Sequence, residues 1–224
     1  LIDTYSTLNF YYALACGILA QKLRLPYILI LHGGELPARL QSSPALTASL
    51  LGRASSLIAP SAYIRQHGVS AGYKAKVIPN FIYINHYRFK ARSKVRPRLL
   101  WIRAFHQIYN PGMAIEVVKN LKNIYNNVHL MMAGPDKDGA KAQCQNLIHT
   151  YNLSENVYLY GKLTKSEWTT LSKKADIFIN TTDFDNQPVS VIEAMALGLP
   201  VISTNAGGLP YLIQHEQNGV LVEK

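Results

Sequence analysis

Strand-like and helix-like runs alternate along almost the whole of this 224-residue chain, and this alternation constrains the fold more than any other feature. Short apolar runs, such as residues 99–102 and 177–180, are typical of buried strands. A longer run at residues 111–125 is typical of a helix. Because strands that alternate with helices pair in parallel, we expect an α/β protein built on parallel sheets.

The regular pattern lapses between residues 80 and 96, where charged and aromatic residues mix without a period. We predict that this segment joins two domains, the first at residues 1–93 with the linker and the second at residues 94–224. Before the linker we count three strands and what looks like the end of another, at residues 27–31, 56–59, 76–78 and 1–3. We therefore expect two Rossmann-like domains, the first incomplete and the second a complete doubly wound set.

The composition of the chain indicates the cellular compartment in which the protein is expected. The hydrophobic share of 48% and the charged share of 16% are ordinary for a soluble globular protein. Cys16 and Cys144 lie in helix-like segments and suggest neither a disulfide framework nor a metal cluster. The apolar run at residues 8–20 is too short to cross a bilayer. We expect a cytoplasmic protein.

The formal net charge of +10 favours anionic partners. A nucleotide-sugar, an acidic glycan and an anionic membrane surface all fit this charge. Since no arginine-rich arm or RNA-stacking motif is present, we expect no nucleic acid. Two interpretations of the basic residues stay open: a patch in peripheral contact with the inner membrane face, and a solvated surface.

The stretch from Asp176 to Val222 says most about function. A strand at residues 177–180 runs into a polar loop, and Pro188 is expected to open a helix that carries Glu193. Asp185 lies in the loop, eight positions before Glu193. Carboxylates accept hydrogen bonds from sugar and ribose hydroxyls, and the free amides of a helix start bind phosphate oxygens. Together they suit a nucleotide-sugar.

The same stretch resembles the retaining glycosyltransferases of the two-Rossmann-domain (GT-B) type, glycosyltransferase family 4 (group 1). Asp185 stands where that family has the first of two glutamates, and Glu193 matches the second. The resemblance implies that the first acid approaches the donor sugar and that the second holds the nucleotide ribose. The matching residues are Glu193-Ala194-Met195-Ala196, Gly198, Pro200-Val201 and Gly207-Gly208-Leu209-Pro210.

Two further positions follow predicted strands, where ligands of open parallel sheets bind. His32-Gly33-Gly34 follows the strand at residues 27–31 and is similar to a family turn that faces the donor sugar. Arg103 follows the strand at residues 99–102 and is suited to bind a diphosphate. Asn110 stands where the family has a lysine, so one phosphate-neutralising charge is missing.

The remaining candidate donor contacts lie on the same expected edge. By resemblance, the segment at Gly161 and Lys162 touches the nucleotide base. Asp183-Phe184-Asp185 spells a pattern that holds a metal in other glycosyltransferases, but helix amides and arginine can offset phosphate charge here without one. We expect no metal and no cofactor. The polar loop and helix start add Asn186, Gln187, Pro188, Val189 and Ser190.

These observations lead to one hypothesis and two alternatives. The hypothesis is a retaining, metal-independent, hexosyltransferase-like enzyme. It would move a sugar from a UDP- or GDP-sugar to a hydroxyl of a glycan or lipid-linked glycan, with Asp185, Glu193 and His32 as catalytic residues. One alternative is a truncated, non-catalytic module that binds a nucleotide or glycan. The other, less favoured, is a sugar-nucleotide epimerase.

Overall fold

The computed structural model describes residues 1–32, 35–67 and 72–224. The chain divides into two compact units, and each is described by itself. The first unit comprises Leu1–Phe81, Phe184–Gln187 and Gly207–Leu212; the second comprises Ile82–Asp183, Pro188–Ala206 and Ile213–Lys224. The domain boundary that we place between residues 93 and 94 stays a prediction.

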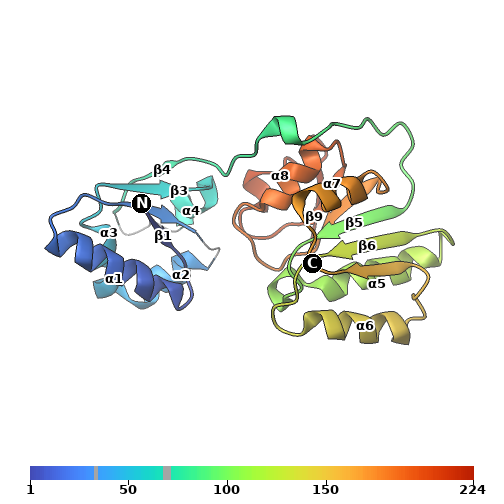
Figure 1. Cartoon of the computed structure of the whole chain (residues 1–224), viewed down its shortest axis with the longest axis horizontal. Coiled ribbons are helices and arrows are strands. Elements are labelled where there is room, and N and C mark those ends of the chain that lie inside the picture. The colour runs from blue at the N-terminus through green and yellow to red at the C-terminus, as the bar shows by residue number, and fades with distance from the viewer. Residues whose placement is uncertain (33–34, 68–71) are drawn as a thin grey trace. The chain divides into compact units, whose positions relative to one another are not determined.

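The first unit holds a four-stranded parallel sheet in the order β1-β2-β3-β4 (Figure 1). The segment at the start of the chain is a strand, and its Ile2 is in register with Leu29 of the next strand. The sequence pattern did not predict α2, which contains Pro37 near its start. The elements are β1 (Ile2–Thr4), α1 (Asn9–Lys22), β2 (Ile28–Leu31), α2 (Leu36–Ser42), α3 (Pro44–Leu51), β3 (Ser56–Ala59), α4 (Ala62–His67) and β4 (Ala75–Val77).

The second unit holds a six-stranded parallel sheet in the order β10-β9-β8-β5-β6-β7. Its strands are β5 (Arg98–Ile102), β6 (His129–Ala133), β7 (Val157–Tyr160), β8 (Ile177–Asn180), β9 (Val201–Thr204) and β10 (Val220–Val222). Its helices are α5 (Pro111–Lys122), α6 (Ala140–Thr150), α7 (Lys165–Ser172) and α8 (Val189–Ala196). The described residues also include three short 3₁₀ turns: η1 (Ile84–His86), η2 (Gln107–Tyr109) and η3 (Leu209–Tyr211). The α/β class with two parallel, Rossmann-like sheets is therefore confirmed.

Helices cover both faces of this second sheet. In Figure 1, α5 and α6 lie on one side of the strands and α7 and α8 on the other. The strand order explains the arrangement. From β5 the chain advances through β6 to β7 in one direction, and from β8 through β9 to β10 in the opposite one. Because crossovers between parallel strands are almost always right-handed, the two directions place their helices on opposite faces. Buried on both faces, strands such as β5 are almost continuously apolar, with Leu99, Leu100 and Trp101 at most 2% exposed.

The segment after Ile82 packs on the second unit. Arg92 donates from its guanidinium to the carbonyl oxygens of Ala175 (3.1 Å) and Leu197 (2.9 Å). The amide of Lys90 also donates to Leu197 O (3.2 Å). Gly198 allows this approach: its φ is +72°, and a Cβ there would lie 2.6 Å from Lys90 O. These contacts place residues 87–92 along the C-terminal half of α8.

Two predicted boundaries move. Pro188 does not open α8 from inside the helix: it is the N-cap, with φ −69° and ψ 117°, and Val189 is the first helical residue. The extended backbone at Pro188 continues the preceding loop. The sequence of residues 209–213 also predicts a short helix, but only Leu209–Tyr211 is helical, and it forms the 3₁₀ turn η3.

Candidate functional site

A cavity of about 280 Å³ lies at the carboxyl end of the second sheet. It forms there because β5, β6 and β7 are neighbours in parallel, so the loops that follow them meet at one edge. The strand order reverses between β5 and β8, and open α/β sheets bind ligands at such a reversal. The lining residues are Ile102, Arg103, Ala104, Ala133, Gly134, Pro135, Lys162, Leu163, Lys165, Trp168 and Glu193.

Gly134 lets two of these loops touch. A Cβ at this position would lie 1.8 Å from the carbonyl oxygen of Arg103, which no side chain tolerates. Two backbone hydrogen bonds fix the approach: Gly134 N donates to Gly161 O (3.1 Å), and Arg103 N donates to Ala133 O (3.2 Å). Gly161 thus supports the edge of the cavity through its backbone, while its neighbour Lys162 lines it.

Glu193 is the carboxylate of the cavity, and it is only 4% exposed. The Tyr87 hydroxyl donates to Glu193 Oε1 at 2.5 Å. Lys165 is the first residue of α7, and its ammonium donates a hydrogen bond to the same oxygen. This ion pair neutralises the buried charge of the Glu193 carboxylate. Burial raises the pKa of Tyr87, and the hydrogen bond to Glu193 and the charge of that carboxylate raise it further. Tyr87 therefore stays a neutral phenol that donates.

Three cations line the cavity together with this carboxylate: Arg103, Lys162 and Lys165. The guanidinium carbon of Arg103 lies 3.9 Å from the centre of the Tyr109 ring, which restrains the arginine by a cation–π contact. The Lys165 ammonium lies 5.7 Å from the centre of the Trp168 ring. The net positive lining suits a di-anionic ligand, and the carboxylate suits a ligand with hydroxyl groups.

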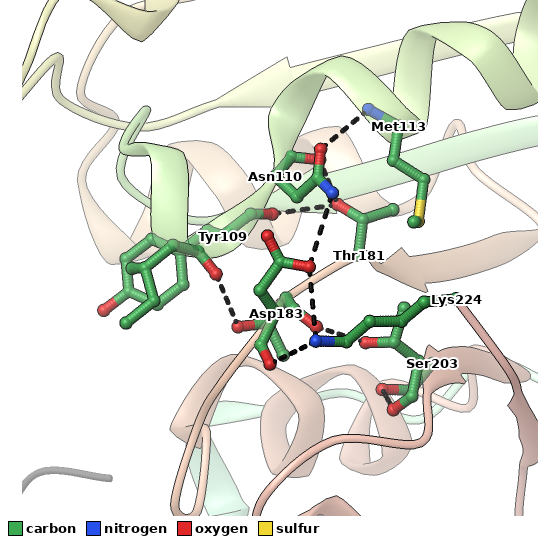
Figure 2. Close-up of polar contacts among 10 residues, drawn as sticks. Tyr109, Asn110, Met113, Thr181, Asp183, Ser203 and Lys224 are labelled. Carbon is green, nitrogen blue, oxygen red and sulfur yellow. Dashed lines mark hydrogen bonds and ion pairs between the residues drawn. The ribbon is translucent and has the colours of Figure 1, made fainter. Parts of the chain in front are cut away.

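Asn110 serves the loop and the helix beside the cavity and does not line it. It adopts φ +44° and N-caps α5, accepting a hydrogen bond from Met113 N (3.2 Å). Figure 2 shows its side chain beside Asp183, at 3.5 Å, and Lys224 on the other side of Asp183, at 3.3 Å. Thr181 donates to Asn110 O (2.8 Å), so the loops after β5 and β8 are tied together.

The Gly207-Gly208 pair shapes the loop that carries Asp185. Gly207 has φ +55°, and a Cβ on it would lie 2.2 Å from Asp185 O. A Cβ on Gly208 would lie 1.8 Å from Asn186 O. Gly208 N donates to Asp185 O (2.8 Å), and the Asp185 carboxylate accepts from Asn186 N (2.7 Å). The glycines are required by close backbone contact at the predicted acid.

The other residues of this loop are also placed by hydrogen bonds. Gln187 accepts from the amide of Asn80 through its side chain (2.7 Å). Asn186 is 7% exposed. At the start of α8, Val189 is partly exposed, while the buried Ser190 hydroxyl has no hydrogen-bond partner among the described residues. An unpaired buried hydroxyl at a helix start is available to a ligand.

His32 lies at the carboxyl end of β2 in the first unit. Its backbone amide donates to Thr4 O (2.7 Å), and its Nε2 lies 3.1 Å from Asp3 Oδ1. Its ring stacks on Tyr5 at 5.2 Å between centres. Gly33 and Gly34 lie outside the described residues. His32 therefore sits at a strand end, as the sequence indicated, held by the neighbouring strand.

Two features are absent from the part of the chain that the structure describes. Within residues 1–32, 35–67 and 72–224, no group of three or more His, Cys, Asp or Glu side chains is arranged to hold a metal ion. In the same described part of the chain, no helix has both the length and the apolar character needed to span a bilayer.

Comparison with known proteins identifies relatives. A family model described as glycosyl transferases group 1 matches residues 85–224, well over half of the chain. The amylovoran biosynthesis glycosyltransferase AmsK of Erwinia amylovora is 28% identical over 229 residues, which cover 92% of this chain and 54% of AmsK. Protein CapJ of Staphylococcus aureus is 24% identical, covering 93% of this chain and 55% of CapJ. The chain thus spans about half the length of these relatives.

Solved structures share the fold. HepE of Anabaena in complex with UDP superposes with a TM-score of 0.80 at 20% identity, covering 99% of this chain and 65% of HepE. The same protein is also known in complex with UDP-glucose, again with a TM-score of 0.80. Sucrose-phosphate synthase of Thermosynechococcus elongatus gives a TM-score of 0.74 at 21% identity, over 99% of this chain and 60% of the synthase.

Proposed function

We propose that this chain, which belongs to the glycosyl transferases of group 1, carries out glycosyl transfer from a nucleotide-sugar to an acceptor hydroxyl. The cavity at the carboxyl end of the second sheet carries the proposal. It combines a buried carboxylate, Glu193, with three cations, and a nucleoside diphosphate offers the matching hydroxyls and charges.

Each predicted residue has a role in this proposal. Glu193 accepts hydrogen bonds from the ribose. Arg103, together with the amides of Val189 and Ser190 at the start of α8, stabilises the departing diphosphate, since fixed donors act most where charge develops. The base is held at Gly161 and Lys162.

The donor sugar is assigned to the predicted acid and its partners. Asp185 and His32 orient it, together with Gly33 and Gly34, which follow the histidine in the sequence, and Asn186, Gln187 and Pro188 shape the loop that carries Asp185. The Asn110 side chain contacts Asp183, two residues before Asp185 in the chain, and contributes no charge to the site. We assign the reaction to the retaining, metal-independent, hexosyl-transferring class of glycosyltransferase family 4, on the resemblance of the Glu193 helix.

The donor and acceptor are proposed by class. HepE is known in complex with UDP-glucose, which supports a UDP-sugar first and a GDP-sugar second. AmsK is named for amylovoran biosynthesis, which supports a glycan or lipid-linked glycan as acceptor. The net charge of +10 suits peripheral contact with the anionic inner face of a membrane, in the cytoplasm.

Incubation with UDP- and GDP-sugars, with and without glycan acceptors, tests the function. Nucleotide release that depends on an acceptor supports transfer, and an axial or equatorial linkage that matches the donor supports retention. Binding without turnover would instead support a non-catalytic module. Interconversion of the donor sugar would support an epimerase.

A further inference from the structure

We infer that Tyr87 and Lys165 are positioning residues that hold Glu193 by one oxygen and leave the other to select ribose. The inference rests on the proposed function and deepens it. Nothing in the motif around Glu193 points to either residue, since one lies 106 positions before it and the other 28. Tyr87 comes from the segment that follows η1, and Lys165 opens α7.

Both donors converge on the same atom. The Tyr87 hydroxyl and the Lys165 ammonium each bond to Glu193 Oε1. The other oxygen, Oε2, accepts no hydrogen bond from any described residue. An ionised carboxylate can accept about four hydrogen bonds, so a nearly buried one with an unused oxygen retains strong acceptor capacity. Two donors on Oε1 also prevent the group from rotating freely.

The two donors have different properties. Tyr87 is 9% exposed, its pKa is raised by burial and by Glu193, and the adjacent chain is fixed on α8 by Lys90 and Arg92. It is therefore a permanent donor. The Lys165 side chain is 55% exposed and long, so its ammonium can leave Oε1 when a phosphate enters the cavity. Tyr87 is the main positioning residue and Lys165 the exchangeable one.

This arrangement predicts selectivity for a nucleotide with both ribose hydroxyls. With Oε1 occupied by Tyr87, Oε2 points a lone pair at the ribose, and a hydrogen bond to a charged group discriminates strongly against an analogue that lacks the hydroxyl. Without the Tyr87 hydroxyl, the Glu193 carboxylate can rotate, and its oxygens alternate between the ribose and the Lys165 ammonium. Affinity for the ribose form then falls, while the diphosphate contacts persist.

The test is a calorimetric comparison of UDP with 2′,3′-dideoxyuridine 5′-diphosphate, with the GDP pair run in parallel. We expect the unmodified protein to prefer the ribose form by about tenfold or more. In Tyr87→Phe the preference should fall to about threefold or less, with affinity for the dideoxy form unchanged. Tyr158→Phe is the matched control, because that hydroxyl donates to Glu155 O at an exposed site away from the cavity.

Three outcomes separate the possibilities. Equal weakening of both ligands in Tyr87→Phe would assign a merely structural role and overturn the inference, as would an undiminished ribose preference. Failure of the unmodified protein to bind either diphosphate would overturn the proposed function itself. Should Tyr87→Phe fail to fold by circular dichroism, a crystal structure of the unmodified protein with UDP decides. A ribose hydroxyl on Glu193 Oε2 with the Tyr87 hydroxyl still on Oε1 supports the inference, and a ribose hydroxyl on Oε1 in place of Tyr87 refutes it.

Discussion

Tyr87 and Glu193, 106 residues apart in the chain, are joined by a hydrogen bond of 2.5 Å at the edge of a cavity lined by three cations. The bond connects the segment that enters the second unit to the helix that carries the family motif. Because Arg92 and Lys90 bind the carbonyl of Leu197, the last turn of the same helix is fixed as well. The position of Glu193 therefore depends on its motif and on a distant part of the chain.

Replacing Arg103 should show how much of the UDP affinity comes from the diphosphate and how much from the nucleoside. We expect Arg103→Ala to weaken UDP binding about tenfold and to leave uridine binding unchanged, because the role proposed for the guanidinium is to bind the diphosphate. Affinity for UDP should also become less sensitive to salt. Lys119→Ala removes one charge from α5, where the ammonium lies over Tyr151, and should do neither. A loss for uridine equal to that for UDP, measured by calorimetry, would contradict the assignment.

Gly134 should be essential to the fold of the cavity edge. We expect Gly134→Ala to lower the free energy of unfolding by about 2 kcal/mol or more, since the added Cβ would lie 1.8 Å from Arg103 O. At Gly161 no atom lies within 4 Å of an added Cβ, so Gly161→Ala should change stability by less than about 0.5 kcal/mol. Urea denaturation measures both. Similar values for the two variants would disprove the close contact.

Part of the cavity lining could be predicted from the sequence, and the reason is locality. Arg103 and Lys162 each follow a strand, and Glu193 lies on the helix after β8, so strand, loop and helix signals place all three at one edge of the sheet. The roles of Asp185 and of the other predicted donor contacts stay predictions. The Thr164–Glu167 capping box likewise marks the start of α7. The sequence pattern does not predict which side chains form hydrogen bonds with Glu193. The pattern at residues 165–174 predicts a helix that starts at Lys165, but nothing in it predicts the contact with Glu193. Tyr87 lies in the segment predicted as a linker.

The fold shows the same division. Strands buried on both faces are readable as apolar runs, and both sheets were expected. Helix α2 was not, because Pro37 and a short length give it a weak periodic signal. Its Leu36 and Leu40 become helical by packing in the core of the first unit. Packing against the rest of the unit determines the secondary structure of such a segment. The local sequence pattern contains no sign of that packing.

The pair between Asp176 and Arg98 should stabilise the second unit. Asp176 is 3% exposed and accepts two hydrogen bonds from the Arg98 guanidinium, at 2.9 and 3.0 Å. We expect Asp176→Asn to lower the free energy of unfolding by about 3 kcal/mol at pH 7, because a charge loses its partner in a largely buried place. Glu116→Gln, at an exposed position on α5, is the control and should have little effect.

The same pair gives a defined dependence on pH. Burial by itself raises the pKa of Asp176, but the hydrogen bonds from Arg98 and Arg96 N, with the charges of both arginines, outweigh it and leave the pKa lowered from 3.8. A lowered folded-state pKa contributes stability above the unfolded-state value and loses it as the pH falls toward the folded-state value. The difference between the unmodified protein and Asp176→Asn should therefore shrink below about pH 4. A difference that stays constant from pH 7 to pH 3 would contradict this.

The two cysteines should differ in reactivity. Cys16 is exposed, whereas Cys144 is 1% exposed and burial raises the pKa of its thiol to about 12, with a further contribution from Asp136. Since the thiolate is the nucleophile, iodoacetamide at pH 8 should label Cys16 alone in the native protein and both residues in urea. Peptide mass spectrometry reads the sites. Rapid native labelling of Cys144 would show that the α6 core is open.

The most direct measurement is a crystal structure of the protein with UDP, repeated with GDP. We predict a ribose hydroxyl within hydrogen-bond distance of Glu193 Oε2, Tyr87 still bonded to Oε1, and the diphosphate beside Arg103. A nucleotide bound elsewhere on the chain, or bound in this cavity with its ribose turned away from Glu193, would contradict the site on which the proposed function depends.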